Sequence, residues 1–422
     1  IWRYFLRVTN TATYRNFTTS VNSVHQQLNR SLNKISSGEL YEKAAESPLS
    51  YYRGKRIDDQ YLDALGKSTL LTDIKNRLYQ QELGARDVQG ILSKAKDQII
   101  YANTDTTNDT PLLSLRDDLL QKEHEIVDAL NGQYQNFYVF GGNDISTPPF
   151  SLKVHPDDKN LFPNQPEGVD VHTLVYTHTF PGDTKPTTFE LSLGITDDTT
   201  DPTTYGYKIS GTKSDGSPMA NEAEAKEGLL KAMKEQGRID IGYGSVRDHN
   251  TLLDTYTGGL NVLTGLTSDA VIGGAGDGHK TQNGATTPDP DDDILAYLNK
   301  SPLALIGRAV QAVDKYVGEA DNPDRDRTEL NHLLSQTITD MVTTEHRVSA
   351  VYSDLGNKYR LLEDTTDKLS LEKNNLTEQY TDVWGADPYE AIVEMYNSQQ
   401  AYNAALKVGT NLMSSSLFDF MR

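Results

Sequence analysis

The sequence predicts a mainly α-helical fold with an inserted α+β domain. Apolar residues recur at spacings of three and four along both flanks of the 422-residue chain, which is the period of an amphipathic helix. Between about residues 148 and 290 short alternating runs replace this pattern, and most of the prolines and glycines lie there. A hydrophobic content of 36% and a mean hydropathy of −0.58 indicate either a thin core or an elongated chain.

The N-terminal flank contains two predicted helical stretches. The first carries an apolar stripe and ends at the Ser-Ser-Gly of residues 36–38, a sequence that interrupts helices. The second runs over about residues 48–130, with a break at the Asn-, Asp- and Thr-rich run 103–110. The stripe of the first stretch consists of Val21, Val24, Leu28 and Ile35, with Leu32 beside it.

The middle of the chain, which opens at Pro148-Pro149, is predicted to be a compact α+β insert. Its strands are expected to alternate on a period of two, and its helix is rich in alanine, glutamate and lysine. The predicted elements are strands at 171–180, 188–195 and 238–245, a helix at 220–236, and a glycine- and aspartate-rich loop at 273–293.

Helical patterning returns at Ile294 and continues to about Asp382. Gly385 breaks it, and Pro388 can begin a new helix because a first-turn proline loses no needed hydrogen bond. The last helix carries a heptad seam in which the glutamine, the glycine and the serine are weak positions. This seam consists of Ile392, Met395, Gln399, Tyr402, Leu406, Gly409, Met413, Ser416 and Phe420.

The two terminal stripes need partners, because neither helix can bury its apolar side alone and isolated helix pairs are marginal in water. The ends can pair with each other and with the ends of neighbouring copies. An ordinary helical bundle closed within one molecule satisfies the same pattern. The periodicity alone favours the bundle.

Charge and composition exclude several classes of function. Lys+Arg 40 against Asp+Glu 60 gives a net charge of −20, which argues against nucleic acid or an anionic membrane as partner. The absence of cysteine excludes disulfides, thiolate metal sites and cysteine nucleophiles. The first ten residues lack the apolar core of a secretory signal peptide, so any export is expected to use a route that does not read one.

No constellation of residues points to an enzyme, and no cofactor or metal site is predicted. Gly66-Lys67-Ser68 ends like a phosphate-binding loop, but Tyr61 stands where that loop needs its first glycine. The nine histidines include no His-Glu-x-x-His zinc motif, and no Gly-x-Ser-x-Gly nucleophile elbow occurs.

Three features have both a ligand-binding and a structural interpretation. His172 and His178 share one face of a predicted strand, where packed or solvated histidines are more common than metal ligands. The acidic run 273–293 lacks the spacing of a calcium loop, so a flexible acidic loop is favoured. The aromatic cluster favours packing where the helical rod meets the insert over a ligand platform. This cluster consists of Tyr134, Phe137, Tyr138 and Phe140.

Segments at both ends resemble the flagellin superfamily, and within it the hook–filament junction proteins (third hook-associated proteins). The similar segments cover both flanks, about 7–150 and 300–422, but not the middle. Leu6 stands where these proteins usually begin with methionine, and residues 1–5 lie upstream of it. The segments are Arg7-Val8-Thr9-Asn10, the helix at 28–38, Ala44 to Pro48, Asn131 to Tyr134 with Tyr138 to Gly142 and Pro149-Phe150, and the closing helix at 399–409 with 416–420.

This resemblance implies an elongated antiparallel helical rod formed by pairing of the N- and C-terminal segments, with the insert projecting sideways. It implies three domains: a terminal coiled-coil assembly domain (1–45 with 386–422), a helical rod domain (46–150 with 294–385) and the variable insert (151–293). The expected assembly interface consists of Val21, Val24, Leu28, Leu32, Ile35, Ile392, Met395, Tyr402, Leu406, Met413 and Phe420.

The function implied is a structural axial protein of the bacterial flagellum, which joins the hook to the flagellin filament. The partners implied are copies of itself, the first hook-associated protein, flagellin and a flagellar export chaperone. The implied location is extracellular, in the flagellum, after type III export without a cleaved signal peptide. Two alternatives stay open: a filament flagellin, and a surface adhesin that binds through the insert.

Overall fold

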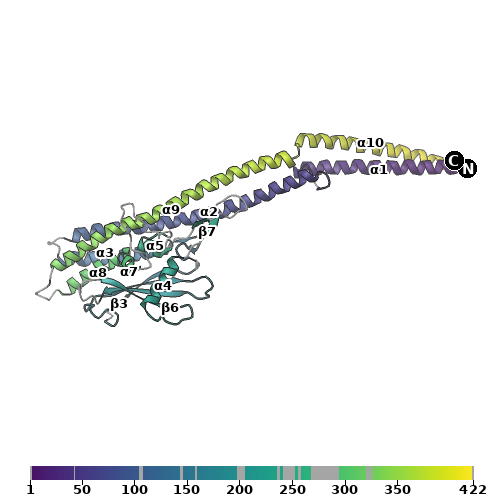
Figure 1. Ribbon diagram of the computed structural model, residues 1–422. Helices are drawn as coiled ribbons and strands as arrows, with labels where there is room; N and C mark the ends of the chain where they lie inside the picture. The colour runs from purple at the N-terminus through teal and green to yellow at the C-terminus, as the bar shows by residue number, and fades with distance from the viewer. Residues whose placement is uncertain are drawn as a thin grey trace. The chain divides into compact units, whose positions relative to one another are not determined.

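A computed structural model describes residues 2–41, 43–103, 108–142, 146–156, 159–196, 205–234, 238–240, 252–254, 258–267, 294–319, 325 and 327–420. For residues 2–11, 13, 238–240, 252–254 and 410–420 the description covers the backbone alone. The chain forms two compact units: Ile1–Leu70 with Thr366–Arg422, and Leu71–Thr365. The fold is mainly α-helical with an inserted α+β domain, as the sequence predicts (Figure 1).

The elements follow in a helical, mixed, helical order along the chain. The helices are α1 (Trp2–Ser37), α2 (Pro48–Ala102), α3 (Asp109–Leu130), α4 (Glu222–Met233), α5 (Gly259–Thr264), α7 (Ile294–Leu298), α8 (Pro302–Gly318), α9 (Arg327–Trp384) and α10 (Pro388–Phe420). The strands are β1 (Gln133–Tyr134), β2 (Phe137–Tyr138), β3 (Phe150–His155), β4 (Val171–His178), β5 (Thr187–Ile195), β6 (Tyr205–Thr212), β7 (Arg238–Asp240) and β8 (Leu252–Asp254).

In the first unit, α1 and α10 lie side by side and antiparallel, so that the start of α1 and the end of α10 meet (Figure 1). Helix α1 ends at Ser37 because Gly38 takes a left-handed conformation, with φ of +72°, and its N–H returns to the carbonyl of Lys34 at 2.9 Å. Helix α10 begins at Pro388, where the Asp387 side chain accepts the N–H of Tyr389 at 2.8 Å.

In the second unit, α2 and α9 pack along a seam with a seven-residue repeat. Ion pairs and ring contacts join the two helices, including Lys96 Nζ to Glu345 Oε2 at 2.6 Å and Tyr79 to Tyr359 with ring centroids 5.7 Å apart. The buried α2 residues of this unit recur every seven positions at Leu71, Leu78, Ala85, Leu92 and Ile99. Those of α9 include Leu334, Met341, Val348, Val351, Leu355 and Leu362.

The insert is built on a four-stranded antiparallel sheet in the order β3-β4-β5-β6. Gly307 of α8 contacts Leu193 of β5, and Gly228 of α4 contacts Phe189 of the same strand. Leu193 and Phe189 are four residues apart in the strand, so their side chains point to one face and both helices pack on it. On the opposite face, Gly194 contacts the ring of Phe162.

The predicted elements are confirmed with some changes of extent. The predicted strands at 171–180 and 188–195 are β4 and β5, and the predicted helix at 220–236 is α4. Strand β7 covers the first residues of the predicted strand at 238–245, while the rest of that strand and the loop at 273–293 lie outside the described residues. The breaks predicted after Ser37, at 103–110 and at Gly385 all separate helices.

Candidate functional site

The paired terminal helices α1 and α10 contain all of the predicted assembly residues, and the least exposed positions of the two helices follow a heptad. The spacing alternates between three and four on both helices, which is the pattern of a coiled-coil seam. The seam consists of Phe17, Val21, Val24, Leu28 and Ser31 on α1, and of Ala391, Met395, Ser398, Tyr402, Ala405 and Gly409 on α10.

The α10 side of this seam alternates large residues with small ones. Gly409 lets the helices approach closely, because a Cβ atom there would lie 2.5 Å from Cζ of Phe17. The ring of His25 lies 5.6 Å from that of Tyr402, and Lys34 Nζ lies 3.0 Å from Glu394 Oε2. The small residues on the α10 side bury less apolar area than large ones would, which limits the stabilisation that the seam supplies.

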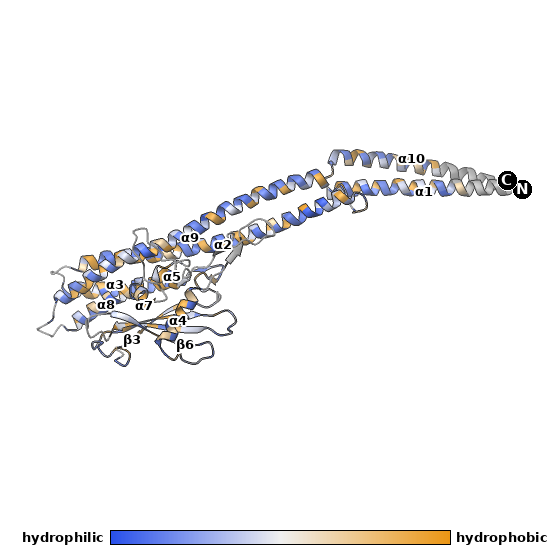
Figure 2. Cartoon of the chain, in the orientation of Figure 1, coloured by the Kyte–Doolittle hydropathy of each residue, from blue (hydrophilic) through white to orange (hydrophobic). Residues whose placement is uncertain are grey.

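Large apolar side chains lie outside the seam. Ala391 is 2% exposed, whereas its neighbour Ile392 is 41% exposed, and Leu406 beside the seam residue Ala405 is 44% exposed. Figure 2 shows apolar residues interspersed with hydrophilic ones along both helices. Besides Tyr14 and Tyr389, the exposed large apolar residues of the pair are Leu32 and Ile35 on α1 and Ile392, Val393, Tyr396, Leu406 and Val408 on α10. We call these seven residues the outer stripe.

The predicted assembly residues therefore divide between two surfaces of the pair. Val21, Val24, Leu28, Met395 and Tyr402 lie in the seam, while Leu32, Ile35, Ile392 and Leu406 lie in the outer stripe. Leu32 is 44% exposed, and Ile35, which continues the α1 spacing four residues after Ser31, is 38% exposed. The side chains of Met413 and Phe420 lie outside the description, and the role of the whole set in assembly stays a prediction.

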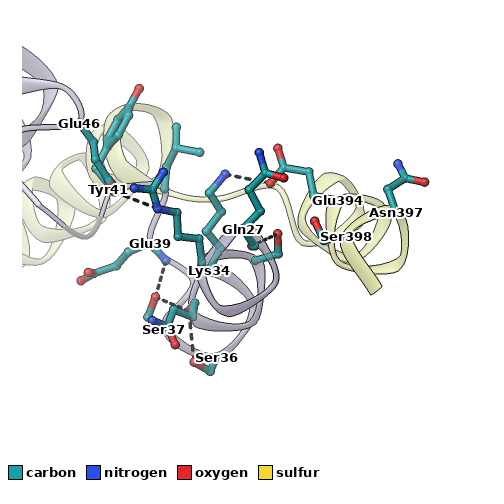
Figure 3. A pocket seen from close by; sticks show the side chains of 14 residues that line it. Gln27, Lys34, Ser36, Ser37, Glu39, Tyr41, Glu46, Glu394, Asn397 and Ser398 are labelled. Atoms are coloured by element: carbon teal, nitrogen blue, oxygen red, sulfur yellow. Dashed lines mark hydrogen bonds and ion pairs between the residues drawn. The ribbon is translucent and has the colours of Figure 1, made fainter. Parts of the chain in front are cut away.

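A polar groove of about 720 Å³ lies between the end of α1, the connector that follows it and the start of α10 (Figure 3). Its charged groups are partly matched within the chain, since Arg30 lies 3.9 Å from Glu46 and Lys34 binds Glu394. No group of three or more histidine and acidic side chains arranged to hold a metal ion occurs among the described residues. The groove therefore offers polar contacts, and no catalytic chemistry is evident in its lining.

The two strand histidines are packed, as the structural interpretation predicts. His172 is buried, and its Nδ1 lies 2.7 Å from Oε2 of Glu123 on α3. Burial lowers the pKa of His172, but the carboxylates of Glu123, Asp314 and Asp170 together raise it more, so the net pKa lies above its usual value. His178 is also buried, with its Nδ1 3.0 Å from the hydroxyl of Tyr176.

The glycine-lysine-serine sequence at 66–68 and the aromatic cluster also have structural explanations. Gly66 to Ser68 lie within the uninterrupted helix α2, so their backbone N–H groups cannot cradle a phosphate. Phe140 is buried against Gly84 of α2, but Phe137 in β2 stays half exposed. The packing interpretation holds for Phe140, whose ring lies against α2.

The segment from Asn131 to Phe150 joins the end of α3 to the sheet. The side chain of Asn131 donates to the carbonyl of Phe150 at 2.8 Å and accepts the N–H of Phe150 at 3.0 Å. Between them the hairpin turns at Gln135 and Asn136, both with positive φ. These residues fix where the insert leaves the helices.

Comparison with known proteins gives little further information. No protein-family model matches the chain, and no curated protein is similar to it. A solved structure from Vibrio parahaemolyticus, described as a "putative flagellar hook-associated protein", matches over 81% of this chain and 100% of that one, at 10% identity and a TM-score of 0.44. Likeness at this level assigns no function. No helix in the described part of the chain has the length and apolar character needed to cross a bilayer.

Proposed function

We propose that this chain is a structural axial protein of the bacterial flagellum, which joins the hook, through the first hook-associated protein, to the flagellin filament. The resemblance of both flanks to junction proteins supports the flagellar assignment. The observation that carries the structural part of the proposal is the outer stripe on the paired terminal helices. No catalytic role is proposed.

The outer stripe supports self-assembly on energetic grounds. Burying a large aliphatic or aromatic side chain stabilises by roughly 1.5–3 kcal/mol, and the terminal pair leaves seven such side chains substantially exposed. Within its internal seam, the small residues Ala391, Ala405 and Gly409 bury less apolar area than larger ones would. A second surface that covers the outer stripe therefore supplies stabilisation that one chain alone lacks.

A second copy of the chain is the occupant we propose for this stripe. Leu32 and Ile35 lie on α1 and Ile392 and Leu406 on α10, so each chain presents apolar residues from two different helices. When one of these surfaces meets the other on the next copy, the contact is heterologous. Heterologous contacts generate rings or helical filaments, which is the form that an axial protein needs.

The proposed partners beyond copies of itself are the first hook-associated protein, flagellin and a flagellar export chaperone. The proposed location is outside the cell, in the flagellum, after export without a cleaved signal peptide. Nucleic acid and membrane are not proposed as partners, because the net charge of −20 repels anionic surfaces.

Immunogold electron microscopy with an antibody to residues 150–290 tests the assignment. We expect a single labelled band at the distal end of the hook, absent from a strain that lacks the gene. Label along the whole filament would make the chain a flagellin. Label on the cell body alone would favour an adhesin that binds through the insert, and either result overturns the junction role.

A further inference from the structure

The two connectors of the first unit are tied to each other by backbone hydrogen bonds. One connector links α1 to α2, and the other links α9 to α10. The N–H of Leu40 donates to the carbonyl of Trp384 at 2.7 Å, and the N–H of Ala386 donates to the carbonyl of Gly38 at 2.9 Å. Glu39 and Gly385 face each other as an isolated antiparallel bridge. The two chain segments thus form one short ribbon.

This ribbon lies where the helices of the unit are interrupted. Gly38 ends α1 through its positive φ, and Gly385 separates α9 from α10. By contrast, α2 runs for 55 residues and α9 for 58 without a break. Within the described residues of this unit, the ribbon is therefore the place where the terminal pair can change its angle to the start of α2 and the end of α9.

Trp384, the last residue of α9, fills the space beside the ribbon. It is 2% exposed, and its ring lies 4.8 Å from that of Tyr51 and stacks on Tyr380 at 6.0 Å. The ring sits directly on the backbone of Gly54, since a Cβ there would lie 1.7 Å from Cε3 of the indole. Any larger residue at position 54 must displace the indole.

The indole is buried at a cost. Among the described residues, none accepts a hydrogen bond from its buried Nε1–H. A buried donor without an acceptor is destabilising, and it regains a partner when water reaches it. The seated indole is therefore held by packing and by the ammonium of Lys55, which lies 5.9 Å from the centre of its ring, and it is opposed by the unpaired N–H. This balance suits reversible release.

A side-chain hydrogen bond at the edge of the ribbon also links the two chain segments and can break and form again. The hydroxyl of Tyr380 donates to Oε1 of Glu39 at 3.2 Å, which links α9 to the connector after α1. Burial, and then the Glu39 carboxylate, raise the pKa of Tyr380 to about 12, so this donor keeps its proton at neutral pH.

We propose that Trp384 is a reversible clasp on a two-stranded hinge. With the indole seated on Gly54, the α1–α10 pair is held at one angle to the start of α2 and the end of α9. When the indole leaves, the ribbon keeps the connectors joined while that angle changes. This device goes beyond the proposed function and does not depend on the flagellar assignment.

Spin-label distances test the clasp, because the chain has no cysteine of its own and accepts a single engineered pair. Labels at Asp59→Cys on α2 and Asn403→Cys on α10 report the angle, and both positions are exposed. Pulsed electron paramagnetic resonance should give one narrow distance in the parent. Trp384→Ala and Gly54→Leu should each broaden it or add a second distance. Gly66→Leu is the matched control, because a Cβ at this α2 glycine meets nothing within 4 Å.

Indole fluorescence gives a second readout that needs no label. In a Trp2→Phe background Trp384 is the remaining tryptophan, since the chain has two. Gly54→Leu should shift its emission to the red and raise its acrylamide quenching several-fold, while Gly66→Leu leaves both unchanged. The clasp is overturned if Gly54→Leu, with its helical circular dichroism intact, changes neither the distance distribution nor the quenching. This variant keeps the test decisive even if Trp384→Ala fails to fold.

Discussion

The sheet of the insert and the terminal helix pair use the same kinds of apolar side chain in opposite ways. In the sheet, Phe189, Leu191 and Tyr176 are almost fully buried among α4, β4 and β5. In the terminal pair, Ile392, Tyr396 and Leu406 remain exposed, while alanine, serine and glycine alternate with Met395 and Tyr402 on the α10 side of the seam. The sheet therefore completes its own core, whereas the pair presents an apolar surface that one chain cannot cover.

The difference distinguishes residues that stabilise the single chain from residues that are available for contacts between chains. A large apolar residue in a complete core contributes to the stability of the single chain. A large apolar residue left exposed contributes little to the single chain and more to a contact with a neighbour. Substitutions in the two regions should therefore separate chain stability from assembly.

Removing a ring from the complete core should have the largest effect on the free chain. Phe189 is 0% exposed and lies against Gly228 and Tyr176, so Phe189→Ala leaves a cavity. We expect a loss of about 3–5 kcal/mol in the free energy of unfolding, measured by urea denaturation. Phe137→Ala, in the half-exposed hairpin, is the control and should cost far less. Equal losses would mean that the core of the sheet is not complete.

Filling the closest point of the seam should have an intermediate effect. Gly409→Leu places a side chain where Cζ of Phe17 already lies within 2.5 Å of the added Cβ. Overpacking of this kind costs about 1–3 kcal/mol, even though glycine is the poorer helix former. Thermal unfolding followed by circular dichroism at 222 nm should show the terminal helices melting earlier. Val408→Leu, at the exposed neighbour, should leave the melting curve in place; an equal shift in both variants would argue against the seam.

A pH dependence in the second unit should be the smallest effect on stability. The folded pKa of His172 is raised above 6.5, so its contribution is complete below that pH and is lost as pH rises through the folded value. The negative charges of Asp314 and Asp170 also raise the pKa of His172. The free energy of unfolding should therefore fall from pH 6 to pH 9, and the fall should be smaller in His172→Gln. An unchanged slope in that variant would assign the dependence to other groups.

The sequence predicts the helices and the insert because a period of three to four and its breaks are local signals. Strands β3 and β6 are not among the predicted elements. Strand β3 alternates apolar and polar residues from Phe150 to His155, which is a local strand signal that the prediction misses, whereas β6 contains two glycines that weaken its pattern. On α10 the predicted seam differs from the observed one by one residue at Ile392 and Leu406, because large apolar residues dominate a hydrophobic pattern. Small residues such as Ala391 and Ala405 mark the seam only once a partner helix approaches closely. The clasp joins residues more than 300 positions apart, and no local pattern reports such a contact.

The most direct test of the central claim compares two double variants of α10. Ile392→Ser with Leu406→Ser alters the outer stripe, and Met395→Ser with Tyr402→Ser alters the seam. Purified chains are followed by sedimentation and negative-stain electron microscopy at increasing concentration, and the monomers by thermal unfolding. We expect the parent to form rings or filaments and the outer variant to stay monomeric, with monomer stability changed by no more than about 0.5 kcal/mol per site. The seam variant should instead lower the stability of the monomer. An outer variant that assembles like the parent, or a parent that never assembles, would contradict the account.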